Sequence, residues 1–300
     1  MTDKIGFIGL GSMGLPMTQV LAAAGQSMRV FDIDATARAR AGAIQGVEVL
    51  ESVAEVAGHA GVLFTCVPND QILEDLYLGA DGVAGAVVAG TVTVDCSTVS
   101  PKATRAVHAA LRDRGAQHLD ASMLGSVPQA ETGQIGFVVG GDRAAFDRVA
   151  PLLDIMGKMV KYVGPSGSAN QVKLIHQTLV AGHAVAVAEA LALCMATGTD
   201  IDAFYDVVCN GGGFAYSRYL EKRTPRMREG DFSPLFMLDL MRKDAGLARD
   251  LAEHVGMDSP LLDRVLSVFD AARDAGYGRE DFSAVAHVYE TAVGKRLADH

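Results

Sequence analysis

Short apolar runs alternate with helix-like segments through the first half of the chain. The runs that favour strands span residues 4–8, 29–31, 61–67, 91–95, 117–120, 136–139 and 159–163. Strands that alternate with helices form parallel sheets, because each helical crossover returns the chain in the same direction. The pattern predicts an α/β fold whose doubly wound, mostly parallel sheet binds ligands beyond the carboxyl ends of its strands.

The second half of the chain shows only helical spacing, and runs of β-branched residues disappear after Gly164-Pro165. The expected helices span residues 168–196, 200–209, 214–221, 236–255, 260–275 and 283–297. We therefore predict a Rossmann-type domain over residues 1–164 and an all-helical domain over residues 165–300, joined by a long interdomain helix.

The first of these helices is very apolar between Thr178 and Ala196. Gly182, His183 and Glu189 interrupt the apolar run. An alanine-rich helix with such interruptions is typical of a protein core rather than of a membrane span. We expect a buried helix and no membrane partner.

Composition and charge narrow the class of protein further. Hydrophobic residues make up 49% and charged residues 21% of the 300 residues, which permits a substantial core and argues against disorder. A formal net charge of −10 disfavours a nucleic-acid surface. The four cysteines show neither C-x-x-C spacing nor a metal-ligand pattern, and no signal peptide precedes the first strand. We expect a cytoplasmic protein with reduced thiols and without a metal site.

The first strand runs directly into a G-x-G-x-x-G motif, Gly9-Leu10-Gly11-Ser12-Met13-Gly14, which opens a helix. In dinucleotide-binding proteins the first glycine allows the tight turn, the second admits the pyrophosphate, and the third lets the helix pack on the strand. The helix N-terminus then presents N–H groups and the positive end of its dipole to the phosphates. These six residues are the expected phosphate-binding site.

Asp32 follows the second expected strand, 23 residues after Gly9. A carboxylate at this place can accept hydrogen bonds from the ribose hydroxyls of NAD and would repel the 2′-phosphate of NADP. The next residues, 33–36, contain neither Arg nor Lys to hold that phosphate. We predict NAD as the cofactor, with NADP disfavoured. The alternative is that Asp32, like Asp34, only forms a turn and a helix cap.

A single lysine stands in the otherwise apolar start of the long helix. Lys173 shares a helix face with His176 and Gln177, which follow it at i+3 and i+4. An apolar setting disfavours the charged form of a lysine, lowers its pKa and makes it usable as a general acid or base. The alternative is a lysine whose ammonium group reaches solvent from an amphipathic helix.

Several motifs spread along the chain point to one family. They are the glycine loop followed by Leu15-Pro16-Met17, Val67-Pro68, Asp95-Cys96-Ser97-Thr98-Val99-Ser100-Pro101, Gly167 six residues before Lys173, Lys243-Asp244, and Asp281-Phe282-Ser283-Ala284-Val285. With these motifs, essentially the whole chain resembles the β-hydroxyacid dehydrogenases of the 3-hydroxyisobutyrate dehydrogenase type, which are related to 6-phosphogluconate dehydrogenase.

This resemblance implies that Lys173 is the catalytic general acid/base. It also implies that Val67, Pro68 and Thr98 line the cofactor, and that Lys243 lies beside both the nicotinamide and the substrate. A further implication is that the helical domain closes over the cleft and builds a homodimer or homotetramer.

The substrate loop departs from the family pattern. Where the family carries D-A-P-V-S-G-G, whose serine and glycines hold the substrate carboxylate, this chain has Asp120-Ala121-Ser122-Met123-Leu124-Gly125-Ser126. Leu124 takes the place of the serine and cannot donate a side-chain hydrogen bond, so Ser122, Ser126 or backbone N–H groups are the candidates to compensate. After the lysine, His176-Gln177 stands where the family usually has Asn-Asn. We expect a substrate other than 3-hydroxyisobutyrate, or one that is held differently.

Together these observations predict an NAD-dependent oxidoreductase that interconverts a small β-hydroxy acid and its semialdehyde or oxo acid. Residues 122–126 and Gln177 would bind and orient the substrate, and Lys243 would anchor its carboxylate. Two alternatives remain, namely reduction of another carbonyl or an imine on the same fold, and a non-catalytic NAD-binding protein.

Overall fold

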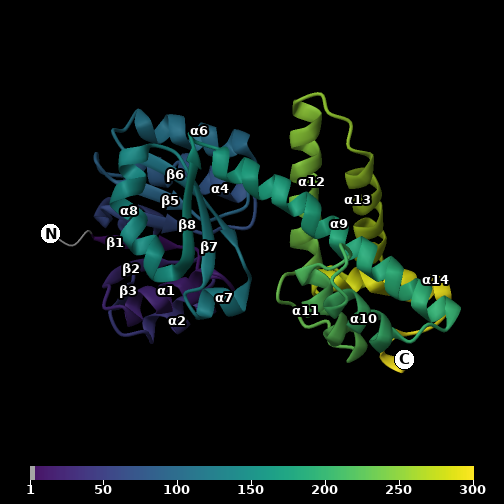
Figure 1. Ribbon diagram of the computed structural model, residues 1–300. Coiled ribbons are helices and arrows are strands. Elements are labelled where there is room, and N and C mark those ends of the chain that lie inside the picture. The colour runs from purple at the N-terminus through teal and green to yellow at the C-terminus, as the bar shows by residue number, and fades with distance from the viewer. Residues whose placement is uncertain (1–3) are drawn as a thin grey trace. The chain divides into compact units, whose positions relative to one another are not determined.

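The computed structural model describes residues 4–300, so the first three residues of the expected 1–164 domain lie outside the described part. The chain divides into two compact units, one ending at Lys173 and the other beginning at Leu174 (Figure 1). The division lies later in the chain than the boundary expected at residue 164, because the first turns of the long helix Ser168–Thr197 are bonded to the sheet unit. Asp120, for example, accepts the backbone N–H of Ala169.

The first unit is built on an eight-stranded sheet with the strand order β3-β2-β1-β4-β5-β6-β7-β8. The strands are β1 (Ile5–Ile8), β2 (Met28–Phe31), β3 (Val47–Val49), β4 (Val62–Thr65), β5 (Val92–Asp95), β6 (Gln117–Leu124), β7 (Ile135–Gly140) and β8 (Gly157–Gly164). Strands β1 to β6 pair in parallel, β7 pairs antiparallel with β6, and β8 pairs in parallel with β7. The predicted doubly wound, mostly parallel sheet is confirmed.

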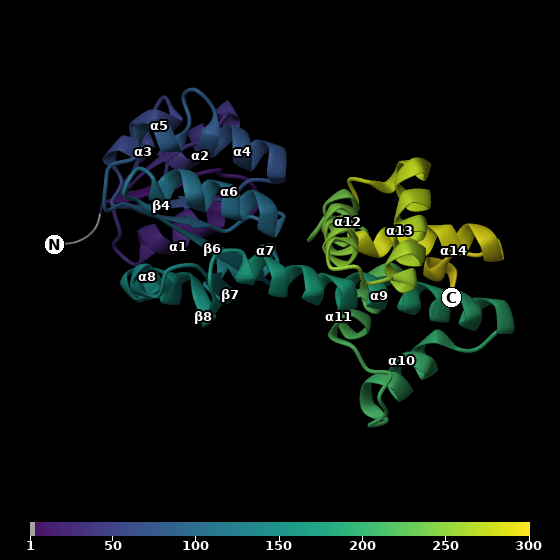
Figure 2. The ribbon, with the colours of Figure 1, turned by 90° about the horizontal axis from the view of Figure 1, so that it is seen from above.

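Helices cover both faces of this sheet. They are α1 (Gly14–Ala23), α2 (Ala35–Gly42), α3 (Val53–His59), α4 (Asp70–Leu78), α5 (Val83–Ala86), α6 (Pro101–Arg112), α7 (Val127–Glu131) and α8 (Arg143–Met156). Consecutive strand side chains point to opposite faces, so Phe7 packs in the cluster under α1, α2, α7 and α8, whereas Ile8 packs in the cluster under α3 to α6. Figure 2 shows α3 to α6 on one side of the sheet and α1 and α8 on the other.

Two strands differ from the sequence prediction. The edge strand β3 has only three residues with a glutamate in the middle, too few for an apolar run, and it forms because it pairs with β2. Strand β6 continues beyond Asp120, because Ser122, Met123 and Leu124 pair antiparallel with β7. The expectation of a loop starting at Asp120 was therefore wrong, and the first part of the substrate segment is a strand.

The second unit is helical. Its elements are the greater part of α9 (Ser168–Thr197), then α10 (Ile201–Asn210), α11 (Arg218–Arg228), α12 (Leu238–His254), α13 (Pro260–Ala272), a π-helical turn (Arg273–Tyr277), a 3-10 turn (Phe282–Val285), α14 (Ala286–Val293) and a second 3-10 turn (Leu297–Asp299). Helix α11 was expected over residues 214–221. It begins instead after Ser217, whose hydroxyl accepts the N–H of Leu220, and it continues through Pro225.

Helix α9 is long and apolar enough to cross a membrane by length and composition alone. Half of its most apolar stretch is nevertheless buried inside the structure. In the helical unit Ala184, Ala188 and Leu191 pack in one cluster with Met241 of α12 and Phe269 of α13. This packing is that of a core helix.

The Asp281-Phe282-Ser283-Ala284 motif forms a polar centre in the helical unit. The Asp281 carboxylate is fully buried and accepts hydrogen bonds from the Arg223 guanidinium, from Ser283, and from the backbone N–H groups of Leu235 and Phe236. A carboxylate can stay buried only when such donors replace water. The motif therefore holds the segment that leads into α12.

Asp95, the last residue of β5, is the centre of a buried polar network in the sheet unit. Its Oδ1 accepts hydrogen bonds from the hydroxyl groups of Thr65 (2.9 Å) and Ser97 (2.6 Å), and the Tyr77 hydroxyl lies 2.9 Å from that of Thr65. Its Oδ2 is buried without a hydrogen-bond partner in the described part of the chain. Burial raises the pKa of Asp95 to about 6, and the hydrogen bonds from Ser97 and Thr65 oppose this rise.

The raised pKa of Asp95 predicts a pH-dependent loss of stability. The folded protein keeps the proton of Asp95 up to about pH 6, whereas the unfolded chain loses it near its ordinary pKa of 3.8. The contribution to stability is complete below pH 3.8 and falls by roughly 3 kcal/mol as the pH rises to 6, at about 1.4 kcal/mol per unit of pKa shift. Asp95→Asn removes this dependence. Urea unfolding of both proteins between pH 4 and 7 measures the difference, and a pH-independent difference would contradict the shift.

Candidate active site

In the glycine loop after β1, the first and last glycines are closely packed, whereas the middle one, Gly11, faces open space. Gly9 has a positive φ of 93°, and a Cβ atom there would lie 2.2 Å from the carbonyl oxygen of Cys66. At Gly14 a Cβ atom would lie 1.9 Å from the carbonyl oxygen of Gly9. At Gly11 it would meet no protein atom within 4 Å. Only the middle glycine faces space that a pyrophosphate can use, which fits the role predicted for it.

The start of α1 also suits a phosphate. Met13, the residue before the helix, makes no side-chain capping hydrogen bond, and the first turn holds no acidic residue. The N–H groups at the N-terminus of a helix need partners from outside it, and the dipole favours an anion there. The loop from Gly9 to Gly14, with Leu10 and Ser12, is therefore a fitting cradle for a dinucleotide.

Asp32 lies at the end of β2 and bonds to the glycine loop. Its Oδ2 accepts the Leu10 N–H at 2.5 Å, and its Oδ1 accepts the Asp34 N–H at 2.7 Å. Asp34 in turn caps α2 by accepting the N–H of Thr36, and this part of the sequence prediction is confirmed. The carboxylate of Asp32 is thus held at the place where an adenosine ribose would lie on this fold.

Arg38 is a residue that the sequence prediction missed. Its guanidinium donates to the carbonyl oxygen of Asp32 at 2.7 Å and lies 5.7 Å from the centre of the Phe31 ring. Residues 33–36 contain no cation, but one turn of α2 brings this arginine back beside Asp32. An anionic and a cationic group therefore stand side by side at the end of β2.

Two loops that carry predicted cofactor residues are tied to each other. Ser97 Oγ accepts the N–H of Val67 at 2.8 Å, and Asp70 accepts the N–H of Ser100 at 2.8 Å. These bonds join the loop after β4, which holds Val67 and Pro68, to the loop after β5, which holds Thr98. Since β1, β4 and β5 are neighbours in the sheet, both loops and the glycine loop lie at one sheet edge.

The two serines of the substrate segment donate their hydroxyl hydrogens inside the protein. Ser122 is fully buried and donates to Asn170 Oδ1 at 3.1 Å. Ser126 donates to Gln129 Oε1 at 3.0 Å and caps α7. A hydroxyl has one hydrogen to donate, so either serine would have to break its bond in order to donate to a substrate. Met123, Leu124 and Gly125 lie between them.

Lys173 lies near the start of α9 and is only 7% exposed. Burial to this extent disfavours the alternative that its ammonium group reaches solvent. Helix α9 begins on Asp120, whose buried carboxylate accepts the N–H groups of Gly167 (2.9 Å), Ala169 (2.9 Å) and Asn170 (3.1 Å). The position of Lys173 on the sheet unit is therefore set by its helix turn.

In the helical unit, one buried carboxylate holds two of the predicted substrate residues. Asp244 is 1% exposed, and its Oδ2 accepts the Gln177 amide at 2.7 Å while its Oδ1 lies 2.9 Å from Lys243 Nζ. An ionised carboxylate only accepts hydrogen bonds, so the Gln177 nitrogen must face Asp244. The His176 ring lies 3.1 Å from the other amide atom, Gln177 Oε1. The Lys-Asp motif was noted from the sequence, but this role of its aspartate was not.

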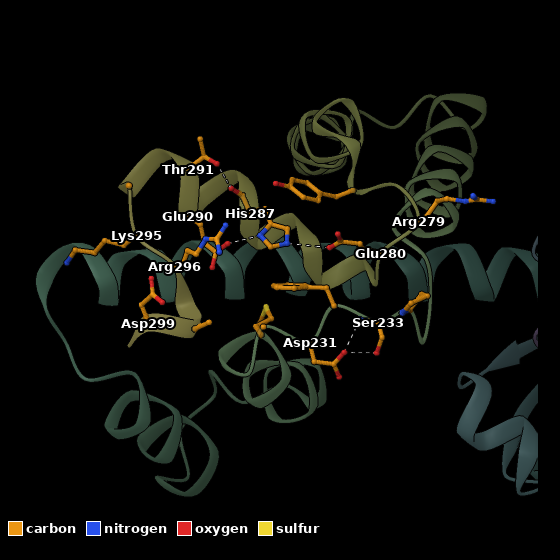
Figure 3. A pocket seen from close by; sticks show the side chains of 17 residues that line it. Asp231, Ser233, Arg279, Glu280, His287, Glu290, Thr291, Lys295, Arg296 and Asp299 are labelled. Atoms are coloured by element: carbon orange, nitrogen blue, oxygen red, sulfur yellow. Dashed lines mark hydrogen bonds and ion pairs between the residues drawn. The ribbon is translucent and has the colours of Figure 1, made fainter.

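A separate depression of about 1040 Å³ lies in the helical unit (Figure 3). Near its centre His287 bonds to Glu290 at 2.7 Å, and its ring contacts the tilted rings of Phe232 and Tyr277, with centroids 4.2 and 4.3 Å away. None of the residues predicted for cofactor, substrate or catalysis lines it. The depression is therefore not the site indicated by the sequence motifs.

Comparison with known proteins identifies the family of the chain. Residues 4–164 match the NAD binding domain of 6-phosphogluconate dehydrogenase, and residues 167–289 match the NAD-binding domain of NADP-dependent 3-hydroxyisobutyrate dehydrogenase. The chain is 34% identical to 2-(hydroxymethyl)glutarate dehydrogenase from Eubacterium barkeri over 97% of its length and 96% of that protein. It is 33% identical to an NAD-dependent L-serine dehydrogenase from Pseudomonas aeruginosa, covering 97% of this chain and 99% of that one.

A solved structure shows the same fold. The 3-hydroxyisobutyrate dehydrogenase of Mycobacterium tuberculosis, described with L-serine, aligns with a TM-score of 0.87 and 31% identity over 96% of this chain and 99% of that chain. The sheet unit and the helical unit match the fold of these relatives. The chain belongs to the β-hydroxyacid dehydrogenase family and is an NAD(P)-dependent oxidoreductase of hydroxy acids.

Proposed function

We propose that the protein catalyses the reversible oxidation of the hydroxyl group of a small β-hydroxy acid, with Lys173 as general acid/base. The observation that carries this proposal is the burial of Lys173 on a helix turn anchored by Asp120. When bound, NAD would accept the hydride that leaves the carbinol carbon of the substrate. Lys173 takes the hydroxyl proton during oxidation and returns it to the forming alkoxide during reduction.

We assign substrate binding to residues 122–126, Gln177 and Lys243. Lys243 brings a cation for the substrate carboxylate. The hydroxyl hydrogens of Ser122 and Ser126 are already engaged, so we assign the further hydrogen bonds to backbone N–H groups near Leu124. The relatives act on L-serine and 2-(hydroxymethyl)glutarate by their names, and both compounds carry a hydroxymethyl group and a carboxylate. A small hydroxymethyl carboxylate is therefore the substrate class that we expect.

Lys173→Ala should lower kcat by about 100-fold or more, because proton transfer by a positioned group contributes at least that factor. The assay follows NADH absorbance with a panel of small hydroxy acids at alkaline pH, and NADH binding is measured by fluorescence. Lys161→Ala, at an exposed lysine on β8, is the matched control and should keep full activity. Near-normal turnover of Lys173→Ala would exclude the assignment.

For the cofactor we propose NAD in preference to NADP. Asp32 and the bonded glycine loop support this choice, because a 2′-phosphate would approach the Asp32 carboxylate. The Arg38 guanidinium beside Asp32 would attract a 2′-phosphate and so favour NADP.

Asp32→Asn should raise kcat/KM for NADP relative to NAD by roughly tenfold, the factor that corresponds to about 1.4 kcal/mol of relieved repulsion. Asp34→Asn is the matched control, since asparagine also caps helices and the variant loses the same charge two residues away. In Asp34→Asn the ratio of kcat/KM for NADP to that for NAD should rise less than in Asp32→Asn. A wild-type protein that prefers NADP would contradict the role given to Asp32.

A homodimer or homotetramer is the assembly that we propose. Helix α9 exposes a stripe of apolar residues on the helical unit that includes Ile175 (61%), Leu179 (63%) and Leu193 (60%). Positions 179, 186 and 193 repeat every seven residues with Ala186 between two leucines, a spacing that favours packing against another helix. A second copy of the chain would bury this stripe.

Leu179→Glu should dissociate the oligomer, because it places a charge within a surface that must lose water on association. Light scattering after size-exclusion chromatography measures the mass. Leu261→Glu is the control, since Leu261 is a similarly exposed leucine (66%) on another helix, α13. A monomeric wild-type protein, or an unchanged mass for Leu179→Glu, would refute this interface.

The cytoplasm is the compartment that we propose. The four cysteines at positions 66, 96, 194 and 209 form no disulfide in the structure. Free thiols are usual in reducing compartments, where glutathione and thioredoxin keep them reduced.

A further inference from the structure

Asn170 lies in the first turn of α9 and is fully buried, although no sequence motif gave it a role. Its backbone N–H donates to Asp120, which fixes the backbone of this turn. Lys173 follows three residues later and therefore lies on the same face of the helix. A polar side chain at 0% exposure needs partners for its polar atoms, and their identity shows what it holds in place.

The side chain of Asn170 bonds to three separate segments of the sheet unit. Its Oδ1 accepts the N–H of Val99 at 3.3 Å and the hydroxyl of Ser122 at 3.1 Å. Its Nδ2 donates to the hydroxyl of Thr104 at 3.0 Å. The Thr104 hydroxyl then donates to the Ser100 carbonyl oxygen at 3.3 Å, so these bonds lead back to the loop after β5 that also holds Val99.

Two of these three partners belong to the proposed site or adjoin it. Val99 follows Thr98 in the loop after β5, and Ser122 opens the substrate segment of β6. Asn170 itself belongs to the helix turn that leads to Lys173. One amide thus joins the cofactor loop, the substrate segment and the lysine helix.

We propose that Asn170 is a positioning residue that holds the Lys173 turn of α9 in register with the cofactor loop and the substrate segment. The inference rests on the proposed role of Lys173. The chemistry requires an amide, because one short side chain must accept from Val99 and Ser122 and donate to Thr104. Aspartate would accept but could not donate, and it would add a second buried carboxylate beside Asp120.

Asn170→Ala removes all three bonds, and kcat should fall by about 10- to 100-fold, since a displacement of about 1 Å at a reacting group costs up to that factor. The dissociation constant for NADH should change by less than about threefold, because the glycine loop and Asp32 stay intact and the loop after β5 keeps its bonds to Val67 and Asp70. The pH profile of kcat/KM should lose or shift the limb that Lys173→Ala abolishes. Asn210→Ala, at an exposed asparagine of α10, is the control and should match the wild type.

A double-mutant cycle separates positioning from a general loss of folding. If Asn170 acts through Lys173, adding Asn170→Ala to Lys173→Ala should lower the residual rate by less than about twofold. An equal fold-change in both backgrounds, with an unchanged pH limb in Asn170→Ala, would overturn the proposal.

Thr104→Val provides the test if Asn170→Ala does not fold. It removes one partner of the amide with little change of shape, and the same pH limb should shift with a smaller loss of kcat. An unaltered limb in a folded Thr104→Val would also overturn the proposal. The proposed function fails separately, namely when Lys173→Ala keeps wild-type turnover or the wild type oxidises no hydroxy acid of the panel while it binds NADH.

Discussion

The contact on which the site depends most is the one between Asp120 and the first turn of α9. The N–H groups at a helix N-terminus have no partners within the helix, and here three of them are buried against a sheet. One carboxylate satisfies all three, and the helix dipole favours its charge at this end. Burial raises the pKa of Asp120, and the same three backbone bonds oppose that rise. The bonds thus offset the cost of burying the charge.

This contact sets the position of the lysine that we propose as general acid/base. It fixes the turn that carries Asn170 and Lys173 to strand β6, and β6 also carries the substrate segment. The loops that we propose to bind the cofactor follow strands of the same sheet. Asp95 and Ser97 link the loops after β4 and β5. Cofactor loops, substrate segment and lysine are therefore positioned by hydrogen bonds to one rigid sheet.

Much of the fold was predictable, because it depends on local patterns. The strands, the long helix and the glycine turn follow from periodicity and from the sterics of Gly9 and Gly14, and the structure contains them. The strand β3 and the continuation of β6 were not predictable, because pairing with a neighbouring strand stabilises them and the residues themselves are too few or too polar. Helix α11 runs through Pro225 for a similar reason, as its flanking residues Leu220 and Met227 are buried in the core.

The sequence by itself determined the class of site: a dinucleotide corner at Gly9 to Gly14, an acid at the second strand and one lysine in an apolar helix. These signals are local, since each depends on residue type and on spacing along one element. Only the tertiary structure decided that Arg38 lies beside Asp32, that the serine hydroxyls near Leu124 are engaged, and that Asn170 joins three segments. Such hydrogen bonds link residues far apart in the chain, and their partners are chosen by strand register and helix packing, which spacing along the sequence does not encode.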